Sequence, residues 1–229
     1  MKKLRKMTTK LIPHVIKMHS NVHYAIGLFI ASVTAIFLSL NVFEYAFIVF
    51  CSTIPDLDFI FKKFARDGNH RNFITHTVYP SIIMIVVGIL VDIFYFGTIL
   101  NIIYFHQVIW IGGIAYLSHI MIDFIDWGLN PFFTNHHFGF YLLITQHEKN
   151  LAHPRTVIDR ERKKDQWFFV KRYYSTRTVL LLDTIISIAG FLSVFAFTPQ
   201  FWYFPIGMFL LLEYHLYQKK KAEEGGPSR

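Results

Sequence analysis

The stretch NIIYFHQVIWIGGIAYLSHIMIDFI, residues 101–125, decides the fold of this chain. Crossing the hydrocarbon core of a bilayer takes about 20 apolar residues in a helix, and this run meets that length. Near its end, His119 and Asp123 are four residues apart, so they share one face of the predicted helix. Ionisable side chains within an apolar run are costly in a membrane and usually functional. The stretch therefore predicts both a membrane helix and part of a site.

Further apolar runs on both sides of this stretch predict an all-α protein, a polytopic membrane bundle of about six helices. The runs lie at about 22–40, 42–54, 77–97, 178–197 and 201–217. Composition agrees, because 53% of residues are hydrophobic and only 17% are charged, whereas a soluble domain carries about 25% charged residues. Long apolar runs argue against a soluble enzyme, and the composition excludes a disordered chain or a disulfide scaffold.

The positive charges are confined to the connections between these runs. All 23 Lys and Arg residues fall in the segments 1–21, 55–76, 126–177 and 218–229. Six membrane helices put these four segments on one side of the bilayer, and the positive-inside rule makes that side the cytoplasm. We therefore expect both termini inside the cell. With the charges placed in this way, the net charge of +8 favours anionic lipid headgroups as the partner. No nucleic-acid partner is expected.

This topology divides the chain into five segments. The expected order is a basic cytoplasmic N-terminal segment (1–21), a membrane core that carries the site (22–135), a cytoplasmic interfacial segment (136–177), a C-terminal membrane helix pair (178–217) and a flexible tail (218–229). The interfacial segment is aromatic and basic. It is therefore expected to form helices or a lid that lie on the membrane surface.

Potential metal ligands gather at the cytoplasmic ends of the first four predicted helices. Helices one and three begin inside and helices two and four end inside, so their ligands share one membrane depth. The candidates are His23, Asp56, Asp58, His70, His76, His119 and Asp123. Imidazole and carboxylate together suit Zn²⁺, with Mn²⁺ or Fe²⁺ as alternatives. Seven such groups are enough for one or two ions.

A metal at this depth favours a hydrolase that acts on a membrane lipid, because a bound ion activates water. We assign catalytic roles to Asp58, Arg71 and Asp123. Arg71 suits bidentate binding of a phosphate oxygen, and Lys62 and Lys63 would attract anionic headgroups. A lipid phosphoester is thus the expected substrate, with a lipid amide or ester as the alternative. A third reading is a non-enzymatic membrane module whose structural metal helps to recruit a cytosolic protein; such a metal site is closed to water.

The ordered motifs of residues 20–135 resemble the YdjM-like family of inner-membrane metal-dependent hydrolases. They are His23-x-x-x-Gly27, Pro55-Asp56-x-Asp58, His70-Arg71 with Thr75-His76, His119-x-x-x-Asp123, Trp127-Gly128 and Pro131. The resemblance implies an α-helical protein of the inner membrane with a metal site. Asp126 departs from the pattern, which has a small polar residue such as Thr beside the tryptophan. No family motif is recognised after residue 140.

Overall fold

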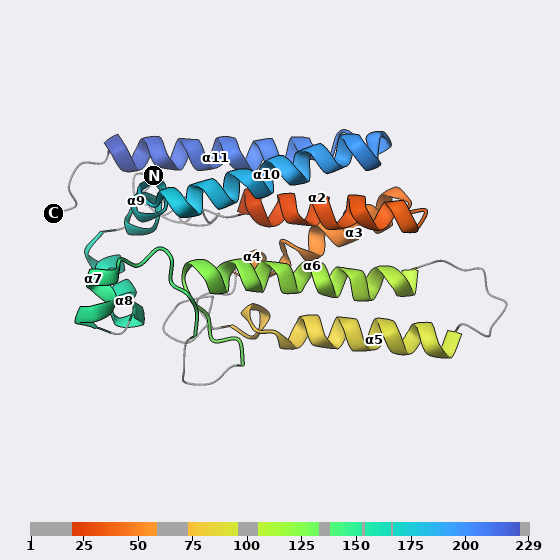
Figure 1. The fold of residues 1–229 in the computed structure, drawn as a ribbon, viewed down its shortest axis with the longest axis horizontal. Helices are drawn as coiled ribbons and strands as arrows, with labels where there is room; N and C mark the ends of the chain where they lie inside the picture. Colours follow the sequence, from red (N-terminus) through yellow and green to blue (C-terminus); the bar gives the residue numbers. More distant parts are fainter. Residues whose placement is uncertain are drawn as a thin grey trace, which may run out of the picture.

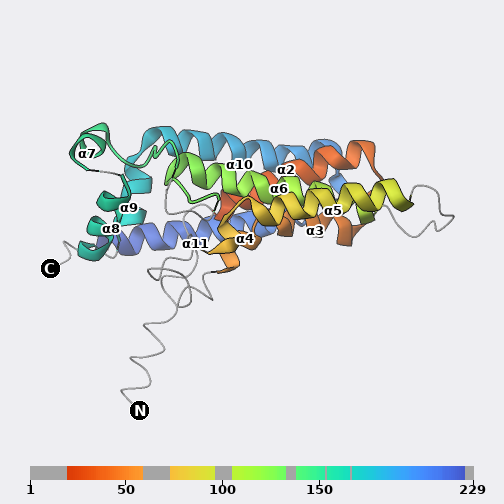
Figure 2. The same cartoon turned by 90° about the horizontal axis from the view of Figure 1, so that it is seen from below.

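The computed structural model describes residues 20–58, 73–95, 105–132, 138–152, 154–165 and 167–224. Within these residues there is no β-strand, only an isolated bridge between Leu129 and Phe138. Six helices form a bundle (Figures 1 and 2): α2 (Ser20–Phe37), α3 (Val42–Cys51), α5 (Tyr79–Tyr95), α6 (Phe105–Asp126), α10 (Arg177–Phe197) and α11 (Pro205–Glu224). The prediction of an all-α bundle is confirmed.

The helices of the bundle alternate in direction along the chain. Helices α2, α5 and α10 begin at one end, where α3, α6 and α11 finish (Figure 1). The same end carries the short helices α4 (Ile54–Leu57), η4 (Ile74–His76), α7 (Gln146–Leu151), α8 (Pro154–Lys164) and α9 (Phe168–Ser175). Every Lys and Arg that the structure describes lies in α7–α9, the first turn of α10 or the last turns of α11. We call this the basic end.

Among the residues that the structure describes, three helices are long and apolar enough to cross a membrane: Ser20–Phe37, Gln107–Asp126 and Arg177–Phe197. Helix α3 has 10 residues, which span about 15 Å, half of a hydrocarbon core of about 30 Å. Helix α11 continues through Glu224. The prediction of a flexible tail from residue 218 is therefore wrong up to that residue, and the rest of the predicted tail lies outside the described residues.

Helix α2 is the centre of the bundle. Figure 1 shows it between the pair α10 and α11 and helix α6, and it contacts α3 as well. It packs closely against α10, where a Cβ built on Gly190 would lie 2.3 Å from the carbonyl oxygen of Ala25. Small residues allow such close packing between membrane helices, where apolar burial alone gives little driving force.

Some buried hydroxyl groups bond one another between helices, which avoids the cost of an unsatisfied polar group in a membrane. The Oγ of Ser32 in α2 lies 2.8 Å from the hydroxyl of Tyr45 in α3 and 3.0 Å from Oγ1 of Thr198, which precedes the short helix η5 (Pro199–Phe201). These bonds tie three elements together at the end opposite the basic end.

The segment after α6 closes the end of that helix. The amides of Phe140 and Leu142 donate to the carbonyl oxygens of Phe124 (3.2 Å) and Ile125 (3.1 Å), which have no partner within the helix. Gly128 makes the reversal possible, because its φ is +70° and a Cβ there would lie 2.4 Å from the ring of Tyr141.

Two polar contacts hold helix α9 in place, one to α7 and one to α10. Arg172 of α9 donates to Glu148 of α7 at 2.5 Å. Partial burial alone would raise the pKa of Glu148, but hydrogen bonds from Thr145 and the charge of Arg172 hold it below the ordinary value. Tyr173 donates to Asp183 of α10 at 2.5 Å. Burial and the carboxylate of Asp183 raise the pKa of Tyr173 well above its ordinary value, so its hydroxyl remains a donor.

Tyr173→Phe is expected to lower the free energy of unfolding by about 1–3 kcal/mol, because it removes a donor from a buried carboxylate. Thermal denaturation in detergent micelles measures the change. Tyr203→Phe is the control, because Tyr203 is exposed at the opposite end of the bundle. Equal stability of the two variants would contradict the prediction.

Candidate metal centre

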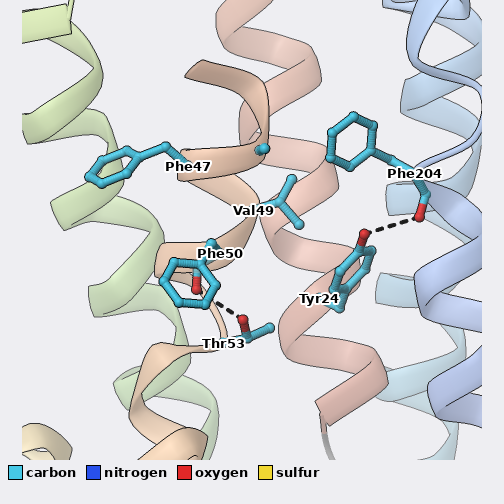
Figure 3. A pocket seen from close by; sticks show the side chains of 7 residues that line it. Tyr24, Phe47, Val49, Phe50, Thr53 and Phe204 are labelled. Atoms are coloured by element: carbon cyan, nitrogen blue, oxygen red, sulfur yellow. Dashed lines mark hydrogen bonds between the residues drawn. The ribbon is translucent and has the colours of Figure 1, made fainter. Parts of the chain in front are cut away.

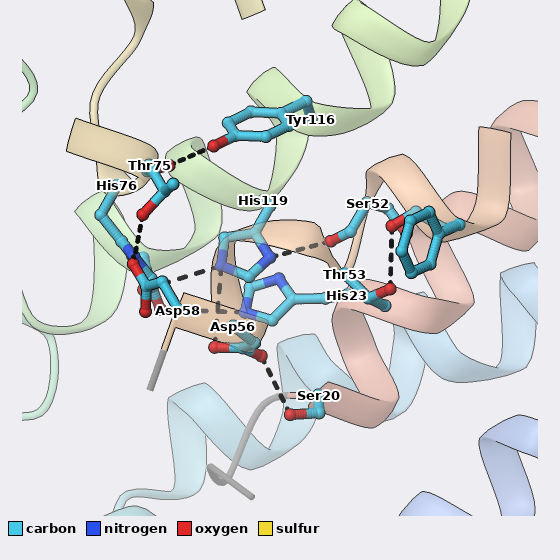
Figure 4. A network of polar contacts seen from close by, with 12 residues as sticks. Ser20, His23, Ser52, Thr53, Asp56, Asp58, Thr75, His76, Tyr116 and His119 are labelled. Carbon is cyan, nitrogen blue, oxygen red and sulfur yellow. Dashed lines mark hydrogen bonds and ion pairs between the residues drawn. The ribbon is translucent and has the colours of Figure 1, made fainter. Parts of the chain in front are cut away.

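The structure brings six of the seven predicted ligands together near the basic end of the bundle; Figure 4 labels all of these except Asp123. They come from the first turn of α2, from α4 and its C-cap, from the end of η4 and from the last turns of α6; they are His23, Asp56, Asp58, His76, His119 and Asp123. The seventh, His70, and the predicted substrate-binding residues Arg71, Lys62 and Lys63 lie outside the described residues.

Five of these residues form two overlapping groups. His23, His119 and Asp123 make one group, and Asp56, His76 and His119 make the other; within each, the potential ligand atoms lie within 4.8 Å of one another. The Nε2 atom of His119 is 3.9 Å from Oδ1 of Asp56 and 3.9 Å from Oδ2 of Asp123. Oδ2 of Asp123 is also 3.5 Å from Nε2 of His76, and its Oδ1 is 3.8 Å from Nε2 of His23.

The tautomer of His119 identifies which nitrogen is available to an ion. Its Nδ1 lies 2.8 Å from the carbonyl oxygen of Ser52. A carbonyl only accepts, so Nδ1 carries the proton and the neutral ring has its lone pair on Nε2. That Nε2 is buried and forms no hydrogen bond with any residue that the structure describes. A lone pair that faces two carboxylates is the arrangement of a metal-ligating histidine.

The spacing around His119 suits an ion better than a proton. A protonated imidazole would bond a carboxylate directly at about 2.7–2.9 Å. Two ligand atoms on either side of a zinc ion, each at about 2.0–2.2 Å, lie at most about 4.4 Å apart. The observed separations of 3.5–3.9 Å fall in the second range.

The two groups have His119 in common, so they overlap at that residue. The Nε2 of His119 has one lone pair and binds one ion. Together the two groups comprise five potential ligands, namely His23, Asp56, His76, His119 and Asp123. Four of their side chains are at most 1% exposed, whereas the side chain of Asp56 is 11% exposed. Asp56 is therefore the member that lies nearest the surface.

The structure places Asp58 behind His76, outside both groups. Its Oδ2 lies 2.7 Å from Nδ1 of His76 and accepts a hydrogen bond from Thr75. A carboxylate on one imidazole nitrogen leaves the other for a metal, and this arrangement is common around metal sites. Tyr116, one turn before His119, donates to the carbonyl of Thr75 and fixes the η4 turn.

Sequence reasoning missed the supporting roles of Ser20 and Tyr116. Ser20 donates to Oδ2 of Asp56 at 2.9 Å and leaves Oδ1 directed at His119. Ser20 gives no signal of its own in the sequence. Tyr116 does, because it lies three residues before His119 and so on the same helix face.

Asp58→Ala is expected to weaken metal binding roughly 10- to 100-fold, as loss of an outer hydrogen-bond partner does at other metal sites. His76 would lose the acceptor that orients its ring. Competition with a fluorescent chelator measures the affinity. Asp165→Ala, which removes an ion pair with Lys171 outside the bundle, should bind metal as the wild type does. Equal affinity in all three proteins would contradict the support by Asp58.

A separate apolar groove of about 420 Å³ opens on α2 and α3 (Figure 3). Its lining consists of Tyr24, Ala46, Phe47, Val49, Phe50, Thr53 and Phe204. No residue of the two ligand groups lines it, so the groove and the His–Asp cluster are distinct features.

The apolar bundle and the buried His–Asp cluster define an integral membrane protein with a candidate metal centre. The chain belongs to the YdjM inner membrane protein family, whose model matches residues 18–197. The match includes every residue of the cluster and continues beyond residue 140, where the sequence motifs ended. Comparison with curated proteins and with solved structures finds no match.

Proposed function

We propose that this inner membrane protein is a metal-dependent hydrolase. The observation that supports the proposal most directly is the Nε2 of His119, buried without a hydrogen bond from the described residues and 3.9 Å from carboxylate oxygens of Asp56 and Asp123. A divalent cation would compensate both carboxylates and bind the lone pair. The ligands are His23, Asp56, His76, His119 and Asp123, and one ion fits their shared position.

The donor set indicates the metal and its chemistry. Imidazole and carboxylate ligands favour Zn²⁺, with Mn²⁺ or Fe²⁺ as alternatives. Such an ion would polarise a phosphoryl or carbonyl oxygen and lower the pKa of a bound water to about 7. Asp123 lies among three histidines, because its Oδ1 faces His23 and its Oδ2 faces His76 and His119. Asp56 marks the side from which water and substrate approach, because it is the most exposed ligand.

The position of the cluster favours a lipid substrate. The ligands lie on elements near the basic end of apolar helices, where anionic headgroups would gather. A lipid phosphoester fits this setting best, and Arg71 with Lys62 and Lys63 remains our assignment for binding its phosphate. A lipid amide or ester is the second candidate, because the same cluster would polarise a carbonyl.

Metal analysis joined to an activity assay tests the proposal. Protein purified without added metal should contain about one ion per chain by elemental analysis, as a single centre requires. It should hydrolyse a short-chain phosphatidic acid, lose this activity on chelation and regain it with Zn²⁺, Mn²⁺ or Fe²⁺. Hydrolysis of a lipid ester alone would select the second candidate. A tightly held ion without any hydrolysis would favour the structural module.

We also propose that the basic end faces the cytoplasm, as the positive-inside rule predicts. Exposed Trp202 and Tyr203 at the opposite end suit the other membrane interface. In a protein with Cys51→Ala, cysteines placed at Gln146 and Lys220 should react with an impermeant maleimide only when inverted vesicles are used. Cysteines at Ser39 and Gln200 should react only in intact spheroplasts. Labelling of Gln146 and Lys220 from opposite sides would contradict the topology.

A further inference from the structure

We propose that Gly27 is a positioning residue of the metal centre, because it lets α2 approach α3 closely enough to hold the Ser52 carbonyl against His119. The inference rests on the proposed metal centre, since it concerns the histidine whose lone pair would bind the ion. Gly27 and His23 are four residues apart, so they lie on the same face of α2.

The carbonyl of Ser52 is available to His119 because α3 ends just before it. Ser52 is the C-cap of α3. The amide of Asp56, which would bond Ser52 if the helix continued, donates instead to Thr53 at 3.1 Å. The Ser52 carbonyl accepts from His119 Nδ1 at 2.8 Å, while its Oγ turns back to the carbonyl of Val49 at 2.7 Å. Figure 4 shows His23, Ser52 and His119 side by side.

Only a glycine fits at position 27 without displacing this cap. A Cβ there would lie 2.3 Å from Oγ of Ser52, 3.0 Å from its Cβ and 3.0 Å from Cα of Val49. Ser52 is fully buried, so its side chain cannot swing into solvent. A methyl group at Gly27 therefore pushes the end of α3 away from α2 and shifts the carbonyl that His119 needs.

The consequence falls on the tautomer of His119. With the Ser52 carbonyl in place, the proton stays on Nδ1 and Nε2 keeps its lone pair. Without that acceptor, the proton is free to move to Nε2, the nitrogen that lies 3.9 Å from an oxygen of each carboxylate, and there it blocks metal binding. Gly27 thus acts through Ser52 and touches neither ion nor substrate.

The test compares the full-length wild type with three variants. Gly27→Ala introduces the clash. Gly27→Ala with Ser52→Gly removes Oγ and Cβ of Ser52 but keeps its carbonyl, so only the contact with Val49 at 3.0 Å remains. Gly190→Ala is the matched control, because its Cβ would lie 2.3 Å from the Ala25 carbonyl and would disturb α2 through a contact with α10 instead of α3.

Two measurements follow each protein. The ¹⁵N shifts of labelled histidines in metal-free protein report the tautomer, with the His119 signal assigned as the one that His119→Gln loses. Titration with Zn²⁺ against a chelator gives the affinity. Gly27→Ala should lose the pure Nδ1–H tautomer and bind Zn²⁺ roughly 10- to 100-fold more weakly. The double variant should restore both properties, and Gly190→Ala should retain both while it unfolds at a lower temperature.

The outcomes separate this inference from the proposed function. An unchanged tautomer and affinity in Gly27→Ala would overturn the inference, as would equal losses in Gly190→Ala. If Gly27→Ala changes the tautomer of His119 but the wild type binds no ion, the positioning role of Gly27 is supported and the proposed function is overturned. If the wild type binds Zn²⁺ and hydrolyses lipid, and Gly27→Ala changes neither the tautomer nor the affinity, the proposed function is supported and this inference is overturned.

Discussion

Asp123→Asn should reduce the bound metal to background and abolish hydrolysis, while the protein still inserts into the membrane. Asp123 is fully buried and its two oxygens lie 3.5–3.9 Å from the nitrogens of His23, His76 and His119. A neutral amide of nearly equal volume keeps the packing but loses the charge that balances a cation. The loss of affinity should exceed the roughly 100-fold that outer partners contribute.

Elemental analysis of the purified variant measures the metal, and thermal denaturation gives an independent readout. Added Zn²⁺ stabilises a protein that binds it in the folded state, so it should raise the midpoint of the wild type and leave that of Asp123→Asn unchanged. Asp92→Asn is the control, because Asp92 accepts from Trp110 at 3.1 Å on the outer pair of helices. Wild-type metal content in Asp123→Asn would mean that Asp123 is not a ligand.

Gly190→Leu should separate α10 from α2. Among the substitutions proposed for this protein, it should lower the free energy of unfolding most. The atoms that a Cβ would meet are the carbonyl oxygen, carbonyl carbon and Cα of Ala25, at 2.3, 2.8 and 3.0 Å. These are backbone atoms, which yield only if a whole helix moves. Overpacking in cores costs about 1–3 kcal/mol even where side chains adjust, so a larger loss is expected here.

Denaturation of the variant in lipid bicelles measures this loss. Thr184→Leu is the matched control, because Thr184 lies on the exposed side of the same helix. It should unfold as the wild type does or at a slightly higher temperature, since leucine partitions favourably into the hydrocarbon core of a bilayer. If both variants unfold alike, the close contact between α2 and α10 is not important for stability.

The sequence was sufficient to predict the helices but not their ends. Hydropathy locates an apolar run, whereas the last turns of α11 are polar and are held by contacts with α9 and by ion pairs such as Lys219–Glu223 at 3.8 Å. The hydropathy of a segment does not indicate whether it forms such contacts. The predicted tail was consequently too long.

For the candidate site, topology predicted the gathering of the residues, and only side-chain geometry could divide their roles. Charge placement brought His23, Asp56, His76 and Asp123 to one depth. Nothing in their spacing indicates that Asp58 would bond the far side of His76. The Ser52 carbonyl is harder still to predict, because every residue has a carbonyl and its availability depends on where α3 stops.

The closure of α6 by residues 138–143 bears on biogenesis. All five candidate ligand residues have been synthesised once residue 123 has been added, but the amides of Phe140 and Leu142 that satisfy the carbonyls after Asp123 come later. Until then, the last turn of α6 depends on water for those bonds. A nascent chain therefore completes the support of the candidate ion site only after synthesis has passed residue 143, while α10 and α11 are still untranslated.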